Sequence, residues 1–168
     1  MMQSDYPKAA AFTGHRFIRS NDRQRLKLHL ESEIAACYHS GIRYFLCGMA
    51  IGFDMLAAET LLAMKTDYPD IQLAAVIPFR GQSCKFNPAD KERYCSILGK
   101  ADKVVCLSET YFDGCFLRRN DYMLRYACHI IAYYNGEPKG GTFYTCRRAE
   151  RMGLKITNLY KPFNITNV

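Results

Sequence analysis

The chain of 168 residues has no tryptophan, no long apolar run, and no basic segment followed by a short apolar one. A membrane-spanning helix needs about 20 mostly apolar residues, and a secretory leader needs a basic start before an apolar core. The sequence therefore predicts a cytoplasmic protein that makes no contact with a membrane.

Metal-binding spacings are also missing. The eight cysteines form no CxxC pair, and the four histidines show neither HxxxH nor HxxE spacing. Zinc sites and disulfide frameworks usually carry such signatures. Several cysteines lie in apolar runs, where reduced thiols pack as small core residues. We therefore expect free cysteines, no metal and no required cofactor. Cys84 and Cys115 are the thiols that we expect to be exposed.

The dinucleotide fingerprint GxGxxG is absent, but another glycine-bearing bend, residues 47–54, separates a short apolar run from an apolar helical pattern. Glycine lets a backbone approach a ligand closely, and the first turn of a helix offers unpaired N–H groups. Gly48 and Gly52 are thus expected either to face a phosphate or to form a plain tight turn. Asp54 either accepts a hydrogen bond from a ribose hydroxyl or caps the helix.

The rest of the chain alternates apolar runs of strand length with helical patterns. The helices are expected between the Ser20–Asp22 caps and Gly41, and at about 53–68, 88–99, 115–127 and 143–152; the strands at about 9–13, 43–47, 71–78, 103–107, 129–134 and 155–160. Such alternation requires right-handed crossovers. It predicts a single-domain α/β fold of the Rossmann-like, doubly wound type: a mostly parallel sheet with helices on both faces, and polar tails at about 1–8 and 161–168.

In doubly wound folds, ligands bind beyond the carboxyl ends of the strands. Thr13, Gly14, His15 and Arg16 follow the first strand. Arg16 suits bidentate contact with a phosphate, although it could be a plain exposed arginine. His15 could bind the ligand or be structural. Neither residue has a nucleophile beside it, so no catalytic dyad is predicted.

Two further segments fall at the same sheet edge. Gly140, Gly141 and Thr142 precede the last helix and form either a second phosphate cradle or a simple bend. Arg119 and Asn120 lie near the start of the preceding helix, where they could close the pocket or cap the helix.

The net charge of +7 is unevenly distributed. Residues 1–113 hold 14 Lys and Arg against 13 Asp and Glu, whereas residues 114–168 hold 9 against 3. This basic excess predicts an anionic partner, either a phosphorylated small molecule or nucleic acid, or else a solvated basic face.

Taken together, these motifs resemble the YpsA-like family of the SLOG superfamily, which joins the DNA-processing protein DprA (Smf) and the LOG nucleotide hydrolases. The resemblance covers about residues 10–155 and rests on segments 13–16, 48–54, 78–82, 119–120 and 140–142. It implies a Rossmann-like domain that binds a nucleotide or an ADP-ribose-like derivative, in the manner of a sensor or regulatory module in bacteria. Gln82 matches the family, and Phe86 stands where a tryptophan is common.

The resemblance leaves two alternative functions open. The DprA branch implies a single-stranded DNA-binding protein, and the LOG branch implies nucleotide hydrolysis. In LOG hydrolases the comparable loop reads PGGxGTxxE, whereas Thr145 stands in this chain at the glutamate position and Glu150 lies five residues further on. A hydrolase would need Asp54, Asp121 or Glu150 as its acid or base. We therefore expect a ligand-binding module, and a homodimer is possible through exposed helices.

Overall fold

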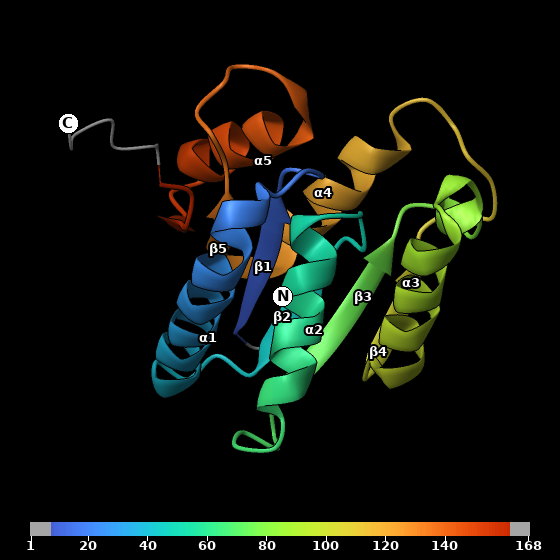
Figure 1. Cartoon of the computed structure of the whole chain (residues 1–168). Helices are drawn as coiled ribbons and strands as arrows, with labels where there is room; N and C mark the ends of the chain where they lie inside the picture. The colour runs from blue at the N-terminus through green and yellow to red at the C-terminus, as the bar shows by residue number, and fades with distance from the viewer. Residues whose placement is uncertain (1–7, 162–168) are drawn as a thin grey trace, which may run out of the picture.

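The computed structural model describes residues 8–161, so the polar tails expected at 1–8 and 161–168 lie almost wholly outside the described residues. Within this range strands and helices alternate as the sequence predicts (Figure 1). The strands are β1 Ala9–Gly14, β2 Tyr44–Cys47, β3 Gln72–Ile77, β4 Lys103–Cys106, β5 Ala127–Tyr133 and β6 Lys155–Asn158. The helices are α1 Arg23–His39, α2 Phe53–Met64, α3 Pro88–Lys100, α4 Cys115–Tyr126 and α5 Gly140–Arg151, with short 3-10 turns η1 Ser20–Asp22 and η2 Gln82–Lys85.

The six strands form one sheet in the order β4-β3-β2-β1-β5-β6. Every neighbouring pair within residues 8–161 is parallel, so the expected mostly parallel sheet is confirmed and is parallel throughout. The chain moves from β1 outward to β4 and then returns to the other side of β1 with β5. The reversal between β1 and β5 is the switch point at which doubly wound folds bind ligands.

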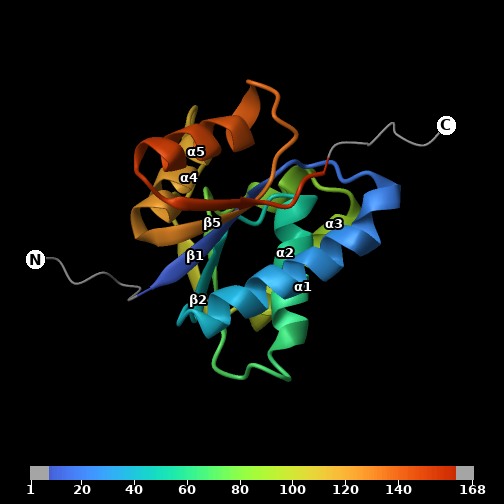
Figure 2. The ribbon, with the colours of Figure 1, turned by 90° about the vertical axis from the view of Figure 1, so that its left-hand side faces the viewer.

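Helices cover both faces of the sheet. In the view of Figure 2, α4 and α5 lie on one side of the strands and α1, α2 and α3 on the other. Alternate residues of β1 point into the two helix layers. Phe12 packs toward α1 and α2, whereas Ala11 packs toward α4 and α5. A strand buried on both faces reads as a continuous apolar run, as the start of β1 does.

Two helices show how the sequence sets this packing. In α1 the predicted stripe Leu26, Leu30, Ile34 and Cys37 is buried as expected from its helical spacing. The α2 helix is buried on nearly every side because α1 and α3 flank it and the sheet lies beneath it. No helix within residues 8–161 has the length and apolar character needed to cross a membrane.

Two helix boundaries differ from the expected ones: α2 ends at Met64 rather than at about residue 68, and α5 begins at Gly140 rather than at Phe143. Gly140 has φ of +89°, and the helix starts directly from this left-handed residue. The Gly140–Gly141 pair therefore belongs to the first turn of the helix and not to a loop before it.

Candidate functional site

A cavity of about 390 Å³ lies at the switch point, beyond the carboxyl ends of β1 and β5. It brings together four segments that are far apart in the sequence: the end of β1, the start of α2, the middle of α4 and the start of α5. Ten of the twelve predicted site residues line it: Thr13, Gly14, His15, Arg16, Asp54, Arg119, Asn120, Gly140, Gly141 and Thr142. The remaining two, Gly48 and Gly52, do not line this cavity.

Gly48 and Gly52 shape the bend beneath the cavity. A methyl group added at Gly48 would lie 2.8 Å from the Arg119 guanidinium, and one added at Gly52 would lie 2.2 Å from the backbone oxygen of Arg16. The bend also holds the buried Met49 at φ of +61°, a left-handed conformation that is uncommon outside glycine. The glycines thus allow close packing against neighbouring segments.

Arg119 is the buried support of the site. Its guanidinium donates hydrogen bonds to the backbone oxygen of Gly48 and, at 2.7 Å, to Asn120 Oδ1. Burial lowers the pKa of the Arg119 guanidinium, while the charge of Asp54 opposes that shift. These contacts fix a positive charge between α4 and the bend after β2.

Asp54 is the buried acid of the site, with only 5% of its surface exposed. Its Oδ2 accepts a hydrogen bond of 3.2 Å from the backbone N–H of Ala50, whereas its Oδ1 has no partner among residues 8–161. Burial raises the pKa of the Asp54 carboxyl to about 6, and the charges of Arg119 and Arg16 oppose the shift. A buried oxygen without a partner is costly, so the site would gain from a ligand that donates to it.

His15 and Arg16 have different surroundings. His15 Nε2 accepts a hydrogen bond of 2.9 Å from the backbone N–H of Asn135, so its ring joins the end of β1 to the loop after β5. The exposed Arg16 makes no side-chain hydrogen bond or ion pair within the described range, and its guanidinium lies 5.5 Å from the ring centroid of Phe116. The Arg16 charge is therefore available to an anion.

The start of α5 completes the opposite wall of the cavity. The first backbone N–H groups of a helix have no partner inside the helix, and no side chain caps them here. Lys139, immediately before the helix, also lines the cavity and pairs with Glu137 at 3.3 Å. Lys139 and Phe116 line the cavity but were not predicted as site residues. The position of Lys139 directly before Gly140 and Gly141 could have indicated its role.

Of the three carboxylates that could serve a hydrolase, only Asp54 lines the cavity. Asp121 pairs with Arg148 and accepts a hydrogen bond from Tyr144, and Glu150 pairs with Arg147. Thr145, at the position of the LOG glutamate, is buried and donates to the backbone oxygen of Gly141 at 2.9 Å. The cavity thus contains one acid of the expected set.

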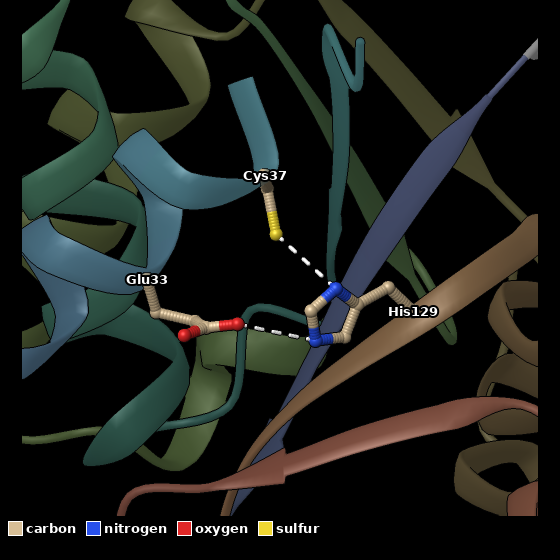
Figure 3. A group of neighbouring side chains, drawn as sticks. All are labelled: Glu33, Cys37 and His129. Carbon is tan, nitrogen blue, oxygen red and sulfur yellow. Dashed lines mark hydrogen bonds and ion pairs between the residues drawn. The ribbon is translucent and has the colours of Figure 1, made fainter. Parts of the chain in front are cut away.

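A separate titratable cluster lies between α1 and β5 (Figure 3). Cys37 Sγ is 3.3 Å from His129 Nδ1, and Glu33 Oε1 is 3.2 Å from His129 Nε2. Burial raises the pKa of the Cys37 thiol to about 12 and lowers that of the His129 imidazole. Potential metal-ligand atoms of these residues lie within 4.8 Å of one another, but Cys37 and Glu33 engage different ring nitrogens. His129 Nε2 also lies 2.8 Å from Thr157 Oγ1, which donates to Glu33 Oε1 at 2.9 Å, so these side chains form a hydrogen-bonded network. The absence of a metal stays a prediction.

The cysteines are all free. Cys84 is exposed as expected, but the expected exposure of Cys115 is wrong because this residue is buried. Cys115 is the first residue of α4, after the left-handed Gly114, and the turn directs its side chain into the protein.

Comparisons with known proteins agree with this architecture. The YpsA family model, described as the YspA SLOG family, matches residues 13–166. A UPF0398 protein of Bacillus velezensis is 26% identical over 143 residues, covering 84% of this chain and 78% of its own. A UPF0398 protein of Shouchella clausii is 29% identical over 122 residues, covering 71% of this chain and 65% of its own.

Two solved structures share the fold. One is DNA processing protein A from Helicobacter pylori, described for its single-stranded DNA binding mode, with a TM-score of 0.64, 19% identity, and coverage of 95% of this chain and 68% of the other. The other is TM1055, with a TM-score of 0.54, 16% identity, and coverage of 89% and 72%. The family match extends over nearly the whole described chain, and the chain therefore belongs to the YspA SLOG family.

Proposed function

We propose that the protein binds a nucleotide or a nucleotide derivative such as ADP-ribose in the cavity at the switch point. The observation that carries the proposal is the unpartnered Asp54 Oδ1 in a cavity whose other walls present positive charge and backbone N–H groups. A phosphorylated sugar offers what these groups lack: hydroxyl donors for the carboxylate and phosphate oxygens for the positive groups.

The proposed contacts follow from the chemistry of each wall. Arg16 and the N-terminal turn of α5 bind phosphate, because both favour negative charge. Asp54 accepts from a ribose hydroxyl, and with a pKa of about 6 it is mainly ionised at pH 7. Arg119 contributes its charge from beneath and holds the bend in place.

Thermal unfolding with AMP and ADP-ribose at millimolar concentration tests the proposal. A ligand that binds only the folded state at 100 times its Kd raises stability by about 2.7 kcal/mol. Arg16→Ala is expected to weaken binding about 10- to 100-fold, since a hydrogen bond to a charged group contributes about 1.5–3 kcal/mol. Arg147→Ala, which removes an exposed arginine outside the cavity, is the matched control. The absence of any shift in the wild-type protein would contradict the proposal.

Binding without hydrolysis is favoured because Asp54 is the one expected acid at the cavity and Thr145 replaces the LOG glutamate. Chromatography of a nucleotide mixture incubated with the protein checks this part of the proposal. Release of free base or phosphate that disappears in Asp54→Asn would establish the hydrolase alternative instead.

A second candidate function is binding of single-stranded nucleic acid, favoured by the distribution of charge. Five arginines line two surface hollows on α4 and α5: Arg118, Arg125, Arg147, Arg148 and Arg151. Phosphate contacts would make binding steeply salt-dependent. Titration of labelled single-stranded DNA at about 50 and 200 mM salt tests this candidate, and no binding at the lower salt would eliminate it.

The cellular setting is also a proposal. Eight free cysteines fit the reducing cytoplasm. Nucleotide binding without hydrolysis fits a sensor or regulatory module better than a hydrolase. A homodimer is a further proposal, which sedimentation equilibrium would test.

A further inference from the structure

A second cavity, of about 620 Å³, lies beside the first at the same edge of the sheet. The two cavities share Arg16, Ala50 and Phe116 in their linings. The Arg16 guanidinium, 5.5 Å from the Phe116 ring, therefore stands at the boundary between a polar cavity and this neighbour.

Aromatic rings form one wall of the second cavity. Phe79 lies 5.5 Å from Tyr111 and 6.1 Å from Phe116, centroid to centroid, and both pairs meet edge to face. Tyr111 is 57% exposed, although large aromatic side chains usually bury most of their surface. An exposed aromatic wall beside an anion-binding cavity offers ring faces on which a planar group can stack.

Two polar side chains beside this wall, those of Gln82 and Glu109, are already engaged. Gln82 donates from Nε2 to the backbone oxygen of Gly48 at 3.0 Å and accepts at Oε1 from Tyr94 at 3.0 Å. Glu109 forms a bidentate ion pair with Arg80, in which Nε and Nη2 of the arginine lie 2.7 and 2.8 Å from the two carboxylate oxygens. The Arg80–Glu109 pair, together with a hydrogen bond of 3.0 Å from the Arg80 backbone N–H to the Ser108 backbone oxygen, joins the segment that carries Tyr111 to the loop after β3. The Gln82 contacts join that loop to the bend after β2 and to α3.

We propose that the second cavity holds the base of the nucleotide whose phosphate occupies the first cavity, with the base against Tyr111 and Phe79. This inference rests on the proposed function and adds the position of the base. Arg16 then lies between phosphate and base, where it can contact both the anion and the planar ring. The ligand class is narrowed to molecules that carry a planar base close to a phosphate.

Comparing sugar phosphate with nucleotide tests the inference by calorimetry. Ribose 5-phosphate carries the sugar and phosphate without a base, whereas AMP, GMP, CMP and UMP add one. At least one nucleotide should bind 10-fold or more tightly than ribose 5-phosphate. Tyr111→Ala should remove most of that advantage without changing the affinity for ribose 5-phosphate, and Tyr111→Phe should retain it because the ring face is kept.

Cys84 supplies a second readout, because its exposed thiol lines the second cavity. Alkylation by iodoacetamide, followed by mass spectrometry of each cysteine, should slow at Cys84 when the best-binding nucleotide is present. Ribose 5-phosphate should give no such protection. Cys95 and Cys128 are exposed but line neither cavity, so their rates should not change.

The outcomes separate the two proposals. If nucleotides and ribose 5-phosphate bind equally and Cys84 is not protected, the placement of the base is overturned while the proposed function stands. If none of these compounds binds, the proposed function fails and the placement fails with it. Equal weakening of both compound classes by Tyr111→Ala also overturns the placement, since it shows a general loss of the site.

Discussion

At the scale of single residues, the buried Asp54 carboxylate lowers the stability of the ligand-free protein when it is ionised. Burial raises its pKa from the ordinary 3.8 to about 6, so the folded protein binds this proton more tightly than the unfolded chain does. Its contribution to stability is complete below the unfolded pKa and is lost as the pH rises through about 6. The shift corresponds to about 3 kcal/mol at neutral pH.

Asp54→Asn should therefore change the pH dependence of unfolding. Below about pH 3 the wild-type residue is mainly neutral in both states, as asparagine is at every pH. Between pH 4 and 7 the wild type should lose up to about 3 kcal/mol of unfolding free energy relative to the variant. Urea titrations of both proteins across this range measure the difference. A constant difference would show that Asp54 ionises in the folded protein as readily as in the unfolded one.

At the scale of elements, two glycines in or next to helices should respond in opposite ways to alanine. Gly52 precedes α2 with φ of +84° and has the Arg16 backbone oxygen in the path of a side chain. Gly52→Ala should cost about 2 kcal/mol or more. Gly99 in α3 has no atom within 4 Å of an added methyl group, so Gly99→Ala should stabilise by about 0.5–1 kcal/mol. Thermal unfolding checks both; destabilisation by both would point to an unexpected constraint in α3.

Local pattern was enough to predict most elements, because the inner strands β1, β2, β3 and β5 are mostly apolar runs and each helix buries apolar residues. The stripe of α1 is confirmed residue by residue, from Leu26 to Cys37. The start of α5 was missed because glycine pairs are typical of loops, whereas here Gly140 takes a left-handed φ and the helix follows at once. The left-handed Met49 had no sequence signal, because surrounding contacts rather than its own propensity impose that conformation.

At the scale of the whole molecule, burial sorts the eight thiols into distinct classes. Cys84, Cys95 and Cys128 are exposed, and Cys106 is half-buried. The buried thiols are Cys37, Cys47, Cys115 and Cys146, and burial raises the pKa of Cys37 and Cys146. Because the thiolate is the reactive form, a thiol reagent should label the three exposed sites rapidly in the native protein and the buried four only after unfolding. Rapid native labelling of Cys37 would contradict the packing of α1 on β5.

The candidate site could be predicted only in outline. The rule that ligands bind at strand ends placed ten residues around one cavity, since parallel strands deliver their loops to a common edge. The contact of Arg119 with Gly48 joins residues 71 positions apart, and that of Cys37 with His129 joins residues 92 apart. Such contacts depend on which face of the sheet each helix covers. The spacing of residues within one segment of the sequence therefore does not predict them.

The hydrogen bond from Arg119 to the Gly48 carbonyl also bears on the order in which the protein folds. The strand β1 pairs with β2 early in the chain but with β5 only after α4 has crossed the sheet, and contacts between distant residues form slowly. The bend after β2 cannot acquire its final support until α4 docks. We expect the cavity to be among the last parts of the molecule to assemble. Local opening of α4 would remove the Arg119 wall of the cavity. We therefore expect a bound nucleotide to slow amide exchange in α4.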